Sequence, residues 1–191
     1  DSVESEQVGD LVHRLVARLV RADLAADEVD GPVAREIAAS VLKHVAAGDD
    51  EQAKLYRFLT TEVLPDLAGS ALWSRVERAA TVYVEEPLEA VTRVDGVDVE
   101  VQGAADLVIV MPDGTHHVEE LKVRLSSSPP PADTLRRYRL QAQVYAWTLT
   151  QQVDDSVRVE ARVTTVGATT ETYTGQLAPA AGLHELIRLK E

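Results

Sequence analysis

Apolar residues recur with helical spacing over the first part of the chain. The i, i+3, i+4, i+7 rule is followed over residues 6–22 by Val8, Leu11, Val12, Leu15, Val16, Leu19 and Val20, which predicts an amphipathic helix. A second helix is expected to begin near Pro32, a residue that suits the first helical turn, and to end before Gly48. Two more are expected over 50–63 and 66–79, so the first 80 residues are predicted to be largely helical.

The pattern changes after residue 80 to short β-branched runs. Strands are predicted over 81–85, 89–94, 97–102, 105–111 and 116–123. Asp95-Gly96 and Pro112-Asp113-Gly114 are typical hairpin turns, so these strands are expected to form an antiparallel meander.

The rest of the chain returns to mixed structure. The segment from Ser126 to Pro131 has three serines followed by three prolines, which indicates a loop that we interpret as a flap near the functional site. A helix is predicted over 133–152, strands over 157–166 and 170–175, and a short helix over 182–189. This order predicts an α/β or α+β sandwich with a central sheet flanked by helices.

Length and composition favour one domain with one core. A chain of 191 residues with 45% hydrophobic content needs no second domain, so residues 1–191 are expected to form a single domain. The only methionine, Met111, lies in mid-chain, and we therefore expect the sequence to be a fragment of a larger protein.

The lack of cysteine limits the metal chemistry. With no cysteine, the chain cannot form a thiolate zinc site or a cysteine-ligated iron–sulfur cluster, which leaves hard, oxygen-ligated metals as the expectation. No apolar run is long enough for a bilayer, and the N-terminus lacks the pattern of a signal peptide. We expect a cytoplasmic protein without a membrane partner.

The charge is strongly negative overall but not uniform. A formal net charge of -13 is unfavourable for binding nucleic acid, because phosphate binding depends on lysine and arginine. Residues 122–139, however, carry only one acid, Asp133, beside a run of basic side chains. This basic strip consists of Lys122, Arg124, Arg136, Arg137 and Arg139.

Three residues beside this strip form the candidate chemical centre. Asp106 opens an apolar strand, and a carboxylate in that setting needs a partner. On the next strand Glu120 and Lys122 project to one face, because side chains alternate along a strand. Two acids and a lysine can therefore converge at one edge of the sheet.

This trio suits metal-assisted hydrolysis of a phosphodiester. Asp106 and Glu120, with the Leu121 carbonyl, can hold an ion, and Lys122 can orient water or stabilise the developing charge. Carboxylate oxygens favour Mg²⁺ or Mn²⁺. Taken alone, this spacing more often reflects a surface ion pair between Glu120 and Lys122, with Asp106 capping a turn.

Other candidate residues have ordinary interpretations. His116 and His117 point to opposite faces of one strand, so they cannot chelate as a pair, and we interpret them as surface residues near a turn. Trp73 and Trp147 could stack on bases, but their apolar surroundings favour the core. The spacing of Tyr138, Gln141 and Tyr145 places them on one helix face, which is also the pattern of a packing face.

Several sequence blocks together resemble a known family. Gly103-Ala104-Ala105-Asp106-Leu107-Val108, followed by a hairpin and Val118-Glu119-Glu120-Leu121-Lys122, is similar to the core of the PD-(D/E)XK nucleases. In order along the chain, the remaining blocks are Gly9-Asp10-Leu11-Val12-His13, Ser74-Arg75-Val76-Glu77-Arg78-Ala79, Glu85-Glu86-Pro87-Leu88 and Tyr138-Arg139-Leu140-Gln141-Ala142-Gln143-Val144-Tyr145. They narrow the resemblance to the RecB-like nuclease domains of helicase-nucleases such as RecB and AddA.

The resemblance implies a restriction-endonuclease-like fold and assigns roles to residues. The helical part, 1–80, would precede a nuclease core over 81–191. His13 would join the metal shell with Asp106, Glu120 and the Leu121 carbonyl. The further roles implied are accessory acid for Glu85, contact with the scissile phosphate or its neighbours for Gln141 and Tyr145, and DNA binding for Arg124, Arg136, Arg137 and Arg139. Glu120-Leu121-Lys122 departs from the family's frequent D-Y-K pattern, which leaves the reach of the second acid open.

The function implied is a Mg²⁺- or Mn²⁺-dependent DNA exonuclease without an iron–sulfur cluster. It resembles exodeoxyribonuclease V and would process double-strand breaks, with a UvrD/Rep-type helicase domain in the parent chain and a second subunit as partners. One alternative is a stand-alone exonuclease or restriction-like endonuclease of the same superfamily. Another is a catalytically silent module that binds DNA or docks a subunit.

Overall fold

The computed structural model describes residues 5–125, 130–167 and 172–175, and these divide into two compact units. The helical unit contains residues 5–78, 121–125 and 164–167. The sheet unit contains residues 79–120, 130–163 and 172–175.

Five α-helices build most of the helical unit. They are α1 (Ser5–Arg21), α2 (Pro32–Leu42), α3 (Asp49–Phe58), α4 (Leu64–Ala68) and α5 (Ala71–Arg78), with a 3-10 turn η1 (Ala26–Glu28) and a π-helical turn η2 (Leu59–Val63). The helix predicted over 6–22 is confirmed as α1, whose apolar stripe is buried at Val8, Leu11, Val12, Leu15, Val16 and Leu19. Pro32 occupies the first turn of α2, as predicted.

The single helix predicted over 66–79 is wrong, because the chain forms two helices there. The break falls at Gly69 and Ser70, between α4 and α5. The Ser70 hydroxyl donates to the Leu67 carbonyl at 2.7 Å and accepts the Trp73 N–H at 3.0 Å. Ser70 thus ends one helix and caps the next, since a serine oxygen replaces the missing backbone acceptor of a first helical turn.

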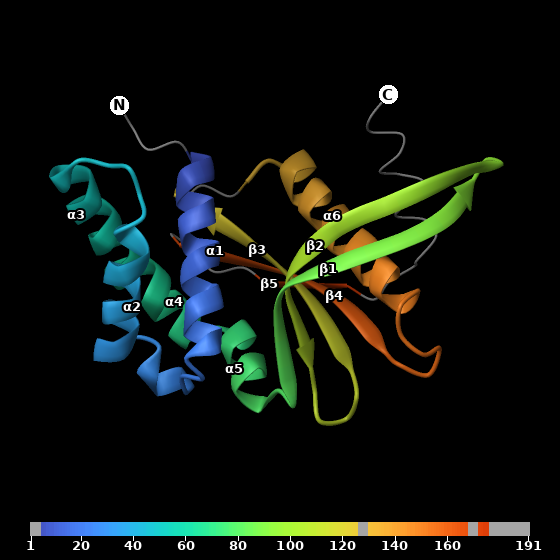
Figure 1. Ribbon diagram of the computed structural model, residues 1–191, viewed down its shortest axis with the longest axis horizontal. Helices are drawn as coiled ribbons and strands as arrows, with labels where there is room; N and C mark the ends of the chain where they lie inside the picture. The colour runs from blue at the N-terminus through green and yellow to red at the C-terminus, as the bar shows by residue number, and fades with distance from the viewer. Residues whose placement is uncertain (1–4, 126–129, 168–171, 176–191) are drawn as a thin grey trace. The chain divides into compact units, whose positions relative to one another are not determined.

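The sheet has five strands in the order β1-β2-β3-β4-β5 (Figure 1). They are β1 (Thr81–Val94), β2 (Val97–Val110), β3 (His116–Arg124), β4 (Val159–Gly167) and β5 (Thr172–Gly175). The antiparallel meander is confirmed for β1, β2 and β3. β4 runs in the direction of β3, because the His116 N–H donates to Arg158 O at one end and Arg124 lies against Gly167 at the other.

One long helix, α6 (Ala132–Thr150), packs on the sheet unit and confirms the helix predicted over 133–152. It closes an apolar cluster made of Leu88, Ala105, Val108, Val118, Ala142, Ala146, Leu149, Ala161 and Val163. A smaller cluster, Ala90, Val144 and Trp147, joins α6 to the β1–β2 hairpin. The predicted mixed α/β fold, with a central mixed sheet flanked by helices, is therefore confirmed.

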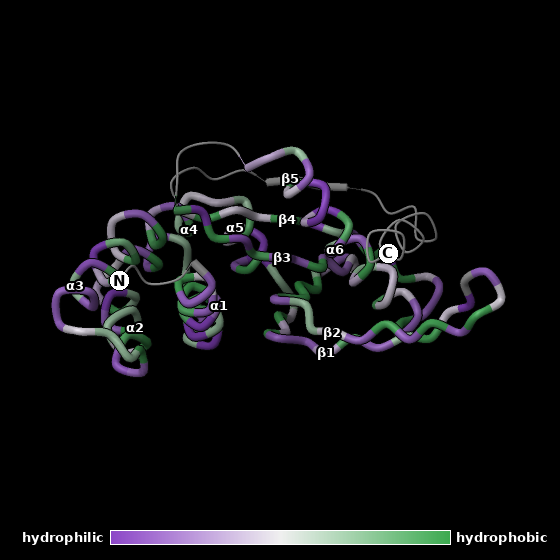
Figure 2. Tube along the Cα trace, turned by 90° about the horizontal axis from the view of Figure 1, so that it is seen from above, coloured by the Kyte–Doolittle hydropathy of each residue, from purple (hydrophilic) through white to green (hydrophobic). Residues whose placement is uncertain are grey.

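The hairpin strands are longer than the sequence pattern suggests. Runs predicted as separate strands on each side of Pro87 and of Gly103 are continuous in β1 and β2. Pro87 is tolerated because β1 is the outermost strand of the sheet, where a missing N–H breaks no second ladder. Asp95 and Gly96 have φ of 50° and 84°, which forms the predicted tight turn. Figure 2 shows hydrophilic and hydrophobic positions alternating along this hairpin.

Some expectations lie outside the described residues. These are most of the flap predicted from Ser126 to Pro131 and the helix predicted over 182–189. Of the helices that the structure describes, none is long and apolar enough to cross a membrane.

Candidate functional site

The two strand carboxylates occupy neighbouring positions on β2 and β3. The ladder between these strands pairs Val108 with Val118 and Leu107 with Glu119. This ladder ends at Leu107 and Glu119, and Asp106 and Glu120 are the next residues along the two strands, so the two carboxylates lie on adjacent strands just beyond the paired stretch. Glu120 is only 1% exposed, and Asp106 is partly buried.

Asp106 also marks a break in the alternation of β2. Ala105 and Val108 should point to opposite faces, yet both belong to the cluster beneath α6. The face of the strand therefore changes between them. The opposite strand is irregular at the same level: Val84 pairs with Leu107 and Glu86 with Ala105.

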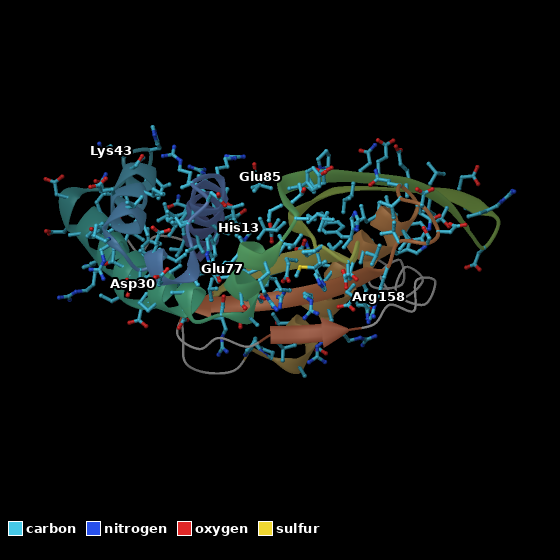
Figure 3. The ribbon with its side chains drawn as sticks, turned by 90° about the horizontal axis from the view of Figure 1, so that it is seen from below. His13, Asp30, Lys43, Glu77, Glu85 and Arg158 are labelled. Carbon is cyan, nitrogen blue, oxygen red and sulfur yellow. The ribbon has the colours of Figure 1, made fainter. Side chains whose placement is uncertain are left out.

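The residue at this irregular point is Glu85. Its φ is 53°, in the left-handed region, and it is skipped in the β1–β2 pairing. Its register position is opposite Asp106, and its side chain is exposed (Figure 3). The structure thus brings the predicted accessory acid to the level of the predicted metal ligand, on the adjacent strand.

In the helical unit, His13 meets the main chain of β3. His13 lies on α1 (Figure 3), and its Nε2 is 3.1 Å from the carbonyl oxygen of Leu121. Two adjacent ligands of an octahedral Mg²⁺, each at about 2.1 Å, would be about 3.0 Å apart. The 3.1 Å separation is compatible with two ligands of one ion, and it is equally the length of an ordinary N–H···O hydrogen bond. Without an ion, Nε2 as the protonated nitrogen donates to the carbonyl.

Three of the predicted site residues are consecutive on β3. β3 carries Glu120, Leu121 and Lys122 in succession, and Lys122 is partly buried. Within the described ranges, no three His, Asp or Glu side chains gather closely enough to hold an ion. The structure thus brings His13 to the Leu121 carbonyl, and the metal shell of His13, Asp106, Glu120 and this carbonyl stays a prediction.

Helix α6 presents the predicted substrate-binding face. Tyr138, Gln141 and Tyr145 are all partly buried on α6, and the two tyrosines pack against the cluster beneath it. The basic strip is less uniform. Arg136, Arg137 and Arg139 are exposed on α6, whereas Arg124 is buried with 8% exposure.

The prediction that His117 is a surface residue is wrong. His117 is 7% exposed, and its Nδ1 accepts a hydrogen bond of 3.0 Å from Arg162 Nε. Glu160 Oε2 lies 3.3 Å from the same nitrogen and 2.8 Å from Arg162, while Glu160 Oε1 lies 2.7 Å from Arg158, at the start of β4. The cause is tertiary, because β4 lies beside β3 and places its charged side chains over the histidine.

The sequence of β4 contains one indication of these contacts among His117, Glu160 and Arg162. Glu160 and Arg162 are two residues apart in a strand, so they share a face, and charges on one face of an internal strand need partners. His116, by contrast, stays near the turn as expected, with Nδ1 2.9 Å from Gly114 O. The prediction that Trp73 and Trp147 belong to the core is confirmed.

Comparison with known proteins agrees with this architecture. Residues 1–186 match the family model described as the PD-(D/E)XK nuclease superfamily, so the chain belongs to that superfamily. Membership implies a metal-dependent nuclease. No curated protein matches the sequence.

Eight chains of solved structures match this protein. One is titled "Crystal structure of SSO0001", with 18% sequence identity and a TM-score of 0.46. That match covers 88% of this chain and 76% of the other.

Proposed function

We propose that this chain is the DNA-hydrolysing domain of a RecB/AddA-like helicase-nuclease, an exonuclease that acts on DNA ends during double-strand break repair. The observation that carries the proposal is the contact of 3.1 Å between His13 and the Leu121 carbonyl. It joins two residues separated by 108 positions, and both belong to the sequence blocks that resemble RecB-like domains.

The proposed reaction is the attack of water on a phosphodiester phosphorus, with loss of the 3′ or 5′ oxygen as leaving group. His13, Asp106, Glu120 and the Leu121 carbonyl would hold the ion. Bound Mg²⁺ or Mn²⁺ would polarise the phosphate and lower the pKa of the attacking water. Lys122 would orient that water or stabilise the charge that develops on the phosphate, and Gln141 and Tyr145 would hold the DNA strand.

The partners follow from the same proposal. A UvrD/Rep-type helicase domain in the parent chain would deliver single strands to the site, and a second subunit would complete the machine. A stand-alone exonuclease or endonuclease of the same superfamily would use the same residues. Helicase motifs upstream in the parent gene would distinguish the helicase-nuclease from a stand-alone enzyme.

The test is degradation of linear single-stranded and duplex DNA with Mg²⁺. We expect Asp106→Ala and Lys122→Ala each to lower the rate about 100-fold or more, because each removes a group that stabilises charge in the transition state. Asp98→Asn is the matched control, since this exposed acid also lies on β2 and should leave the rate unchanged. Equal rates for the wild type and both alanine variants would refute the proposal.

Thermal denaturation with Mn²⁺ separates a nuclease from a silent docking module. An ion that binds only the folded state at 100 times its dissociation constant stabilises it by about 2.7 kcal/mol. We expect this shift in the wild type and its loss in Asp106→Ala. A wild type without any shift would instead support the silent module.

A further inference from the structure

Gly103 lies in β2 directly beneath the ring of Tyr145. A Cβ atom at Gly103 would be 2.6 Å from Cε1 and from the hydroxyl oxygen of Tyr145, and 2.8 Å from Cζ. Such distances are too short for real contacts, which start near 3.0 Å. The φ of Gly103 is not in the left-handed region, so glycine is required here for space and not for backbone conformation.

The ring of Tyr145 has little room to move aside. It packs against the cluster of Ala142, Ala146 and their neighbours, and also against the cluster of Ala90, Val144 and Trp147. Helix α6 contacts both β1 and β2. A methyl group at position 103 would therefore push the ring out of its place, because a packed core does not absorb an added carbon without shifts.

The polar end of Tyr145 is available to a ligand. Within the part of the chain that the structure describes, no hydrogen bond involves its hydroxyl, and the same is true of the Gln141 amide one turn earlier. Both side chains are partly buried on one face of α6. A phenol that packs with its ring and keeps its O–H unbonded can donate to a phosphate oxygen.

The place of this hydroxyl along β2 separates it from the cleavage centre. Gly103 precedes Asp106 by three residues, and a strand rises about 3.3 Å per residue, so the two backbone positions are about 10 Å apart. At about 3.4 Å or more per nucleotide along one strand, this corresponds to roughly one to three nucleotides. The hydroxyl is suited to a phosphate beside the one that is cut.

We propose that Gly103 is a positioning residue, whose missing side chain holds the Tyr145 hydroxyl against β2 as the donor to a neighbouring DNA phosphate. The inference rests on the proposed function and adds to it a phosphate contact by Tyr145 that Gly103 positions. Tyr145 then contributes to the binding of the strand and not to the chemistry at the cut bond, and its contribution requires glycine at position 103.

The experiment is a double-mutant cycle read by steady-state kinetics on a single-stranded oligonucleotide. We expect Gly103→Ala and Tyr145→Phe each to raise KM about fivefold or more with kcat nearly unchanged. The double variant should be no worse than either single variant, because the methyl group disturbs a ring that has already lost its hydroxyl. Ala104→Ser, exposed on the next position of β2, is the control and should leave KM unchanged.

One further measurement tests the fit between Gly103 and Tyr145 separately from the nuclease assignment. In thermal denaturation, Gly103→Ala should lower the stability of the wild type but not that of the Tyr145→Ala variant, because the small side chain removes the clash. This outcome supports the fit between the two residues even if the wild type cuts no DNA, a result that would refute the proposed function alone. Additive effects of the two substitutions on KM, or a fall in kcat at constant KM, would overturn the inference.

Discussion

Glu85 shows how much one backbone angle contributes to the site. A left-handed φ of 53° is unfavourable for a residue with a side chain, and it occurs at the level of Asp106, where β2 changes face. The exposed Glu85 carboxylate and its backbone angle can be tested separately, because different substitutions remove one or relieve the other.

We expect the Glu85→Gly protein to be more stable than the Glu85→Gln protein by about 0.5–1 kcal/mol. Glycine adopts this φ without steric cost, and this gain exceeds the larger backbone entropy that glycine loses on folding. Both variants lack the carboxylate, so both should lower the nuclease rate equally if Glu85 acts as an accessory acid. Urea denaturation and the DNA degradation assay give the two quantities. If Glu85→Gly were less stable than Glu85→Gln, the left-handed backbone angle at position 85 would not be a source of strain.

At the scale of elements, the end of β4 is tied to β3 and α4. Gly167 has a φ of 120°, and a Cβ there would clash with the carbonyl oxygen of Arg124. Its N–H donates to the Asp66 carboxylate of α4 at 3.0 Å. The close approach to backbone leaves no flexible side chain that could yield, so this junction depends on glycine.

Gly167→Ala is expected to destabilise the protein by about 3 kcal/mol or more, through both the clash and the unfavourable φ. Gly9→Ala is the matched control, since Gly9 lies within α1 and a Cβ there would meet no atom within 4 Å. That change should stabilise the helix by up to about 1 kcal/mol. Chemical denaturation of both variants would show opposite signs, and equal stability of Gly167→Ala and wild type would exclude the packing described.

At the scale of the whole molecule, the charge opposes the proposed substrate. A formal net charge of -13 repels DNA, so binding depends on where the basic side chains lie. Three exposed arginines share the first half of α6, Arg136, Arg137 and Arg139. Arg124 is buried and does not share their exposure.

Replacing the three α6 arginines with glutamine should weaken the binding of single-stranded DNA and flatten its salt dependence. Each phosphate contact contributes about 0.7 to the slope of log K against log salt, so a loss of about 1–2 is expected. Fluorescence anisotropy over a range of salt concentrations measures this slope. Arg93→Gln, at the far end of the hairpin, is the control. An unchanged slope in the triple variant would place the DNA elsewhere.

The sequence by itself was enough for features that depend on neighbours along the chain. The stripe of α1, the Asp95-Gly96 turn and α6 follow from periodicity and turn chemistry, which act within a few residues. The places of Asp106 and Glu120 on adjacent strands were predictable in the same way, because one hairpin joins β2 to β3. The break between α4 and α5 at Ser70 also depends on neighbouring residues, but the apolar pattern over 66–79 predicted one continuous helix.

Only the tertiary structure decided which distant residues meet. The burial of His117 depends on β4 lying beside β3, and the need for glycine at position 103 depends on the Tyr145 ring across the sheet unit. The contact of His13 with Leu121 spans 108 residues. Periodicity shows which face of an element is apolar, but not which other element covers it, because that choice is made by packing across the whole chain.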